Sequence, residues 1–380
     1  MKKLFLIILS FISVLTYGQK AINPGSIEGA EAGEKLIGEL YAIDEELVQN
    51  NTKVFSAEVS MNIFSQKLTK NNSYTKKQVY KYTGLSLLAN LATITGTGSL
   101  DSTAMSNMDI PWWLYTAMGS HHLPLYALDA KKALRYTAPD AAFLAMHLAS
   151  KKQPTLSFVP LHFYINDQFF STYEIYKITR QKTKKGIYPE DWKTYDRKDL
   201  MIAPFKKENL IKPIVYVPIA VATIVSIVVA AKNKDAIWNT GTSYIDGEKI
   251  PIAAGVTKTM VTNSLKFDAT AAGEEALYRG VVYEELKLKM GPIKAKIADA
   301  ILFPAIHIPG DIAKNASVDD MINNFIFRSF STLLFDFAYD KGGLPASTAL
   351  HFWFNNLGST INWFGKGGVP PLTIGFSTTF

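Results

Sequence analysis

Two adjacent carboxylates and an arginine lie in an otherwise apolar stretch, Gly273-Glu274-Glu275-Ala276-Leu277-Tyr278-Arg279-Gly280. On a helix, Glu275 and Arg279 are four residues apart and share a face, so the two can pair, whereas Glu274 points about 100° away. This geometry predicts two roles for the acidic pair. Glu275 is neutralised by the arginine and holds the helix in place, while Glu274 faces a cavity and can act as a general base toward water.

Two later apolar segments each contain one or two polar residues, and their motif residues are spaced as on one face of a helix. Phe303 and His307 are four residues apart, and so are His351 and Asn355. A polar group in an apolar helix is costly to bury unless it has a partner or a function. Three helices can therefore direct these polar groups and Glu274 toward one point.

Such a set of side chains suits hydrolysis. Glu274 and His307 would deprotonate a water molecule, while His351 and Asn355 would donate hydrogen bonds to the oxyanion that develops on the attacked carbonyl. Glu274, His307 and His351 could equally bind zinc, because two histidines and a glutamate are the ligands of several hydrolytic metalloenzymes. A third interpretation is that the polar groups only hold helices together. The chain has no cysteine, which excludes thiol catalysis and thiolate ligands.

The order Glu274-Glu275-x-x-x-Arg279, Phe303-x-x-x-His307 and His351-x-x-x-Asn355 resembles the CPBP family of intramembrane proteases. This family includes the type II CAAX prenyl endopeptidases and bacterial bacteriocin-processing and immunity proteins, and the resemblance covers about residues 210–365. It implies a peptidase in which Glu274 and His307 activate water, His351 and Asn355 form the oxyanion side, and Glu275 and Arg279 support the site. Whether the enzyme is a glutamate protease or a zinc metalloprotease stays open.

The sequence around the second motif departs locally from the usual pattern. Pro304 directly follows Phe303, and Pro309-Gly310 follows His307. Proline interrupts the hydrogen bonds of a helix interior, so the second-motif helix is predicted to be short or kinked.

The resemblance also leaves a non-enzymatic function open, a membrane scaffold or a bacteriocin-immunity-type protein of the same fold. The expected partners are membrane lipid and, for an enzyme, a peptide or membrane-protein substrate. Nucleic acid is not expected despite the net charge of +7, because the basic residues flank apolar runs and no nucleic-acid motif accompanies them. A prenylated CAAX protein is not an expected substrate of an exported bacterial protein.

The rest of the chain must place these residues in a membrane. Hydrophobic residues make up 48% and charged residues 19%, which is apolar for a soluble protein. Residues 213–231 carry no charge and are long enough to cross a bilayer. Residues 1–18 have the basic start, apolar run and small residues of a signal peptide. We therefore expect a multi-pass protein of a bacterial cytoplasmic (inner) membrane with an exported amino terminus.

The predicted fold is all-α, a polytopic membrane helical bundle with an amino-terminal helical extension. Residues 19–205 form an amino-terminal region of unknown role, possibly with weak membrane helices, and residues 206–380 form the peptidase domain, with its core at 255–365. The basic segment 177–212 is interpreted as a solvated cytoplasmic loop, and the acidic pair Glu284-Glu285 as part of a solvated face. Residues 233–249 are interpreted as a polar connector.

Overall fold

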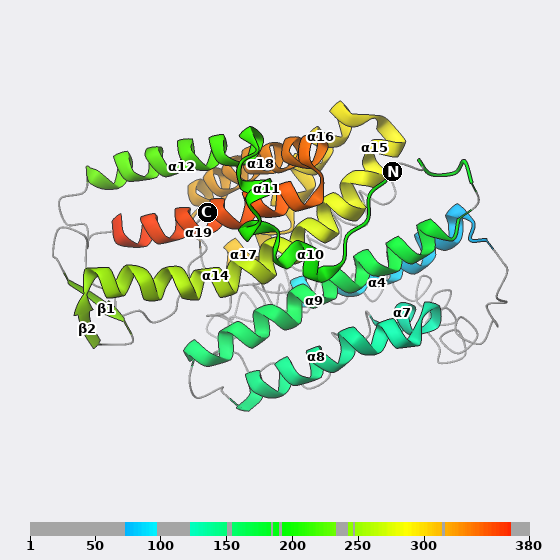
Figure 1. Cartoon of the computed structure of the whole chain (residues 1–380), viewed down its shortest axis with the longest axis horizontal. Coiled ribbons are helices and arrows are strands. Elements are labelled where there is room, and N and C mark those ends of the chain that lie inside the picture. Colours follow the sequence, from blue (N-terminus) through cyan, green and yellow to red (C-terminus); the bar gives the residue numbers. More distant parts are fainter. Residues whose placement is uncertain are drawn as a thin grey trace, which may run out of the picture. The chain divides into compact units, whose positions relative to one another are not determined.

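The computed structural model describes residues 73–96, 122–149, 154–183, 185–189, 192–232, 242–245, 248–313 and 316–365. Within these ranges the protein is almost entirely helical (Figure 1). The predicted signal peptide, residues 1–18, and residues 19–72 of the predicted amino-terminal region lie outside the described residues. The predicted all-α class is confirmed for the part that is described, apart from one short hairpin.

The helices fall into an amino-terminal group, a set of short connecting turns and a carboxy-terminal group. The first group is α4 (Lys76–Gly96), α7 (Leu123–Leu128), α8 (Ala130–Ala149) and α9 (Pro154–Gln181). Short turns α10 (Arg197–Met201), η2 (Ala203–Phe205) and α11 (Lys207–Leu210) lead to α12 (Pro213–Ala231). The last group is α14 (Ile252–Leu277), η3 (Tyr278–Tyr283), α15 (Glu284–Met290), α16 (Pro292–Ala305), α17 (Ile308–Ala313), α18 (Val318–Gly342) and α19 (Leu344–Gly365).

A two-stranded antiparallel hairpin precedes α14. Strand β1 (Thr242–Ile245) pairs with β2 (Glu248–Pro251), with Thr242 opposite Pro251. This hairpin overlaps the end of the segment interpreted as a polar connector, residues 233–249, and is a small departure from the predicted all-α fold. The helix that follows it, α14, continues through both glutamates of the first motif.

Helix α12 has the bounds predicted from its uncharged sequence between Lys212 and Lys232. The predicted membrane crossing is not confirmed, because none of the helices in the described ranges is both long enough and apolar enough to cross a membrane. Pro218 lies inside the helix without ending it. The helix packs along α19, which also packs along α14 on another side (Figure 1).

Helix α9 packs closely against the helix of the first motif. A Cβ atom on Gly273 would lie 2.9 Å from the Cβ atom of Asn166, and one on Gly280 would lie 2.7 Å from the ring of Tyr173. Both pairs are seven residues apart, so each falls on one face of its helix. Glycines on both sides of the acidic pair therefore let the amino-terminal region form a wall of the candidate site.

Gly280→Ala is expected to lower the melting temperature of the purified protein. The new methyl group would overlap the ring of Tyr173, and such overpacking typically costs about 1–3 kcal/mol. Gly84→Ala on α4 is the matched control, because a Cβ atom there meets nothing within 4 Å. Alanine also favours a helix, so the control should be unchanged or more stable. Equal melting temperatures for the two variants would contradict the close packing of α9 on the motif.

Candidate active site

The candidate site lies where α14 ends against α19. Glu274 and Glu275 occupy the last turn of α14, and Arg279 follows in η3, a six-residue π-helical segment. All three side chains are buried, with Glu275 and Arg279 fully inaccessible and Glu274 4% exposed. Short π-helical segments inside α-helices often occur at functional sites.

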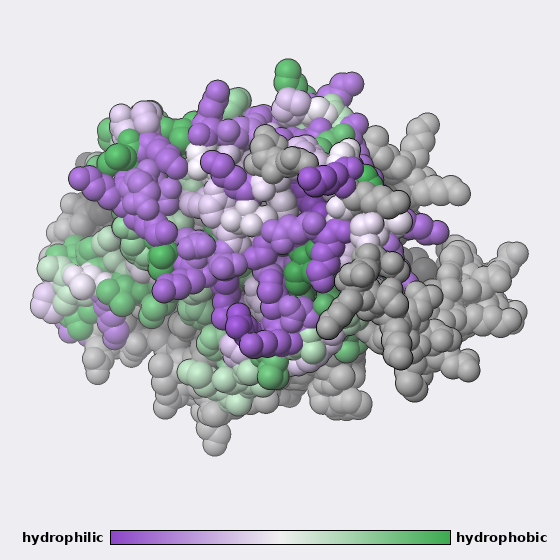
Figure 2. All heavy atoms as spheres, turned by 45° about the vertical axis from the view of Figure 1, so that its right-hand side comes forward, coloured by the Kyte–Doolittle hydropathy of each residue, from purple (hydrophilic) through white to green (hydrophobic). Residues whose placement is uncertain are grey.

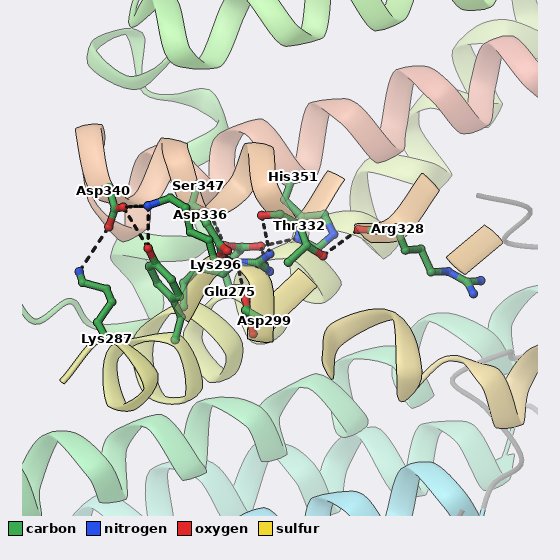
Figure 3. Close-up of polar contacts among 12 residues, drawn as sticks. Glu275, Lys287, Lys296, Asp299, Arg328, Thr332, Asp336, Asp340, Ser347 and His351 are labelled. Atoms are coloured by element: carbon green, nitrogen blue, oxygen red, sulfur yellow. Dashed lines mark hydrogen bonds and ion pairs between the residues drawn. The ribbon is translucent and has the colours of Figure 1, made fainter. Parts of the chain in front are cut away.

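The predicted pairing of Glu275 with Arg279 is confirmed. Arg279 Nη1 donates a hydrogen bond to Glu275 Oε1 at 2.9 Å. Glu275 also accepts hydrogen bonds from the Ser347 hydroxyl and from His351 Nδ1, the latter at 2.8 Å (Figure 3). Glu275 therefore connects α14 to α19 and orients the histidine of the third motif, besides neutralising the arginine.

Arg279 is also bound by two aspartates that lie outside the three motifs. Its Nε atom donates to Asp336 Oδ1 at 3.1 Å and lies 3.8 Å from Asp299 Oδ2. Both aspartates are fully buried. One guanidinium therefore faces three carboxylates from α14, α16 and α18, and the group carries net negative charge unless two of the carboxyls are protonated.

Two phenylalanine rings enclose this arginine. The guanidinium carbon lies 5.1 Å from the ring centre of Phe303 and 5.2 Å from that of Phe335. Arginine over an aromatic ring is held by cation–π attraction, which is stronger away from water. Phe303, the first residue of the second motif, thus fixes the arginine of the first.

His351 lies between the two glutamates of the first motif. Because the Glu275 carboxylate only accepts hydrogen bonds, Nδ1 of His351 is the donor in their contact, and Nε2 is the nitrogen that faces Glu274. The distance from His351 Nε2 to Glu274 Oε2 is 3.7 Å. This separation exceeds a direct hydrogen bond and allows one water molecule to contact both atoms.

His307 lies in the turn between α16 and α17, as the predicted interruption at Pro304 requires. Helix α16 ends at Ala305, and the His307 amide donates to Pro304 O at 3.0 Å. The carbonyl of Phe303 accepts instead from His307 Nδ1 at 2.8 Å. This contact places the Nδ1 proton and makes Nε2 the nitrogen that can accept a proton. Helix α16 is 14 residues long and contains Pro304, so the predicted interruption of the second motif takes the form of a helix end one residue after this proline.

Phe303 connects the two histidines of the site. Its ring centre lies 4.9 Å from that of His307 and 6.3 Å from that of His351. The His351 ring itself stacks on Phe335 at 4.4 Å. The second and third motifs therefore meet across aromatic rings, while the first and third meet through hydrogen bonds.

Asn355 is the predicted site residue that this network does not include. It lies one turn beyond His351 on α19 and is half-buried. Among the hydrogen bonds of the described residues, none joins Asn355 to Glu274, Glu275 or His307. Its neighbour Asn356 is buried and donates to the Ser264 hydroxyl at 2.8 Å.

A metal site formed by Glu274, His307 and His351 does not assemble in this geometry. Within the described part of the chain, no group of three or more histidine, aspartate or glutamate side chains is placed to hold a metal ion. As placed, these residues do not fit the zinc alternative.

Asp299, Asp336 and Ser347 join the site without being predicted from the sequence. A signal was available, because an aspartate in an apolar helix is rarely buried without a charged partner. Asp299 precedes Phe303 by four residues, and Ser347 precedes His351 by four, so each shares a helix face with a motif residue. Asp336 lies within residues 210–365, over which the sequence resembles the family, but it belongs to none of the three motifs.

Residues 264–357 match the family model Rce1-like, described as type II CAAX prenyl endopeptidase Rce1-like. The match includes every residue of the three motifs. This segment belongs to the Rce1-like family. The resemblance inferred from the motifs is thereby confirmed for this part of the chain, and the family is one of peptidases. No curated protein and no solved structure matches the chain.

The Rce1-like segment begins within α14 and ends within α19. It contains the three aspartate and serine side chains that support Arg279 and Glu275, as well as the motif residues. Helices α9 and α12, which pack against it, lie outside the match. The walls of the site therefore come partly from sequence that the family does not define.

Proposed function

We propose that the chain is a membrane-embedded endopeptidase that hydrolyses a peptide bond with water activated by Glu274. The observation that carries this proposal is the buried arrangement of Glu274 Oε2 and His351 Nε2, 3.7 Å apart, inside the Rce1-like segment. A water molecule held between them is positioned to attack a carbonyl carbon. No step of the reaction is assigned to a metal.

In the proposed mechanism, Glu274 takes a proton from the water as its oxygen bonds to the carbonyl carbon. His307 assists through Nε2, since its Nδ1 proton is fixed on Phe303 O. The carbonyl oxygen becomes an oxyanion, and Glu274 then passes the proton to the leaving amine as the carbon–nitrogen bond breaks. The attack of water, the breakdown of the tetrahedral intermediate and the release of the amine therefore all use the same carboxylate, which first accepts a proton and then returns it.

His351 stabilises the oxyanion in this proposal. It donates from Nε2 when protonated, and the Glu275 carboxylate on Nδ1 stabilises the resulting imidazolium. Asn355 is the proposed second donor, from the next turn of α19. Glu275 and Arg279 act as positioning residues, and Asp336 and Asp299 hold Arg279 from behind.

We further propose that the protein is a multi-pass protein of a bacterial cytoplasmic (inner) membrane with its amino terminus exported. Large apolar side chains point outward along α12, and several on α16 and α18 do the same: Val217, Val221, Ile224, Val225, Ile297, Ile301, Ile322, Ile326 and Phe330. Extensive apolar surface of this kind favours contact with lipid or another apolar partner. Peptides or membrane proteins at that surface are the proposed substrates.

The test compares membranes that contain the wild-type protein with membranes that contain the Glu274→Gln variant. New protein amino termini that arise only with the wild type would identify both the activity and its substrates. The absence of any difference, with both proteins present at equal amounts, would refute the peptidase. A biological effect that persists in Glu274→Gln would support the alternative, a non-enzymatic scaffold or immunity-type protein.

Chelation is expected to leave the activity unchanged. The proposed base acts on water directly, and the described residues offer no three-ligand metal site. The measurement is the cleavage rate of the purified protein before and after prolonged treatment with EDTA and 1,10-phenanthroline, together with elemental analysis for zinc. Loss of activity that added zinc restores would favour the metalloprotease alternative over Glu274-activated water.

A further inference from the structure

A cavity of about 720 Å³ lies beside the turn that joins α18 to α19. It is lined by residues from α9, the loop before α10, α15, the end of α18, the α18–α19 turn and the residue directly before α12, among them Arg180, Trp192, Lys212, Lys287, Lys341 and Gly343. The catalytic candidates Glu274, His307 and His351 do not line it. The cavity is therefore separate from the candidate active site, although α19 passes from one to the other.

The cavity wall is strongly basic. Five cationic side chains line it, and only two carboxylates accompany them, Glu284 and Asp340. Lys287 pairs with both carboxylates, at 2.9 Å and 3.3 Å, and Glu284 also pairs with Arg180 at 3.2 Å. Lys296 pairs with Asp340 as well (Figure 3). The two acids are thus already neutralised by neighbouring cations.

Among the described residues, three lysines of the cavity wall have no carboxylate partner. Over the described ranges, no carboxylate pairs with Lys193, Lys212 or Lys341, all of which line the cavity. The Lys212 ammonium donates to Gly342 O at 3.1 Å and to Asn209 Oδ1 at 3.3 Å, which fixes it at the turn. An ammonium has three donors, so one is available to a ligand.

A buried arginine forms part of the same wall, contrary to the predicted solvated loop at 177–212. The side chain of Arg180 is 3% exposed and stacks on the Trp192 ring, with 4.0 Å between the guanidinium carbon and the ring centre. Its Nε and Nη2 atoms have no hydrogen-bond partner among the described residues. Its partner Glu284 is also buried, which corrects the predicted solvated face. Arg180 therefore adds a fixed positive charge to the wall of the cavity.

The backbone of the α18–α19 turn also lines the cavity. Gly343 has a φ of +77°, and a Cβ atom there would lie 2.9 Å from the Tyr195 hydroxyl oxygen. Glycine therefore lets Tyr195 approach the turn, directly before the amino-terminal end of α19. The positive end of this 22-residue helix adds to the field of the lysines.

We infer that this cavity binds a phosphate group, carried either by a phospholipid headgroup or by a small soluble phosphate ester. Three uncompensated ammonium groups exceed the single charge of a carboxylate, whereas phosphate offers up to two charges and several oxygen acceptors. The volume lies within the range of small-ligand sites, about 300–1,000 Å³. Figure 2 turns forward the end that carries α15, and the surface there is mainly hydrophilic.

The experiment measures binding to the full-length protein purified in a neutral detergent. The probes are glycerol 3-phosphate, short-chain phosphatidylglycerol, short-chain phosphatidylcholine and a neutral peptide with a free terminal carboxylate. A double variant, Lys193→Gln with Lys341→Gln, removes two uncompensated charges. The matched control, Lys249→Gln with Lys294→Gln, removes the same charge from two exposed lysines that do not line the cavity.

Phosphate binding should weaken about tenfold or more in the cavity variant and stay close to wild type in the control, since each charge-assisted hydrogen bond contributes strongly. Binding of glycerol 3-phosphate would identify a soluble ester as sufficient, and binding of the phospholipids alone would identify a headgroup. Equal weakening in both double variants, or tighter binding of the peptide carboxylate than of every phosphate, would overturn the proposal. Glu274→Gln should bind the phosphate probe normally, so this test is independent of peptidase activity.

Discussion

Glu274→Gln is expected to lower kcat by about 100-fold or more while the protein stays folded. Glutamine has nearly the same size as glutamate but cannot accept a proton from water, and general base catalysis typically contributes about 10²–10⁴ in rate. Among the residues that the structure describes, Glu274 has no ion pair shorter than its 3.7 Å contact with His351, so its replacement leaves the Arg279 network intact. The change should therefore affect the chemical step and leave KM nearly unchanged.

The measurement uses a peptide identified from the wild-type cleavage products and compares kcat and KM for purified proteins. Asp319→Asn is the matched control, because this carboxylate is exposed in the first turn of α18 and belongs to none of the three motifs. It should retain full activity. A folded Glu274→Gln protein with wild-type kcat would show that another group activates the water.

The difference between Glu274 and Glu275 could be predicted from spacing alone. Residues four apart on a helix must share a face, and the structure places Glu275 on Arg279 and turns Glu274 toward His351. The interruption after Phe303 was equally predictable, because proline cannot continue the hydrogen bonds of a helix. Both predictions depend only on residues a few positions apart in the chain, and these can be read directly from the sequence.

Contacts between distant segments could not be predicted in the same way. The bonds of Glu275 to Ser347 and of Arg279 to Asp336 join residues more than fifty positions apart. A lone buried aspartate carries no periodic signal that identifies its partner. Asp336 therefore remained unassigned, although its apolar surroundings indicated that it needed one.

The basic segment shows how composition alone can mislead. Residues 177–212 are rich in lysine and arginine, which is typical of a solvated loop. In the structure, Lys177 and Arg180 are buried on α9, where Lys177 pairs with Glu174 at 2.7 Å and Arg180 pairs with Glu284. Glu174 lies one helical turn before Lys177, and Glu284 lies on a helix about a hundred residues after Arg180. The number of charged residues in a segment predicts neither pairing.

Arg279→Met is expected to cause the largest loss of stability of any single substitution in the site. Methionine keeps much of the apolar stem between the Phe303 and Phe335 rings but removes the charge. Glu275, Asp299 and Asp336 would then remain buried without their cation. Removal of one partner from a buried ion pair typically costs about 3–5 kcal/mol.

Arg279→Lys separates charge from geometry. A lysine keeps the positive charge but cannot donate to Glu275, Asp336 and the Thr332 carbonyl at once, as the guanidinium does. Its loss of stability should be smaller than that of Arg279→Met. Its kcat should still fall, because a displaced Glu275 no longer orients His351.

The comparison with a second buried arginine decides whether the three carboxylates matter together. Arg328 contacts Asp311 through both terminal nitrogens, at 2.5 Å and 3.0 Å. Arg328→Met therefore leaves one buried carboxylate without its cation, whereas Arg279→Met leaves three. Thermal unfolding should therefore show a larger loss for Arg279→Met than for Arg328→Met, and the added change Asp336→Asn should restore part of it. Asp336→Asn removes one of the negative charges left without a cation, so it should stabilise the Arg279→Met protein if repulsion among the carboxylates causes the loss. Further destabilisation would show that this repulsion is not the cause. Equal losses for the two arginine variants, with no recovery in the double variant, would show that packing of the arginine and not charge balance holds the site together.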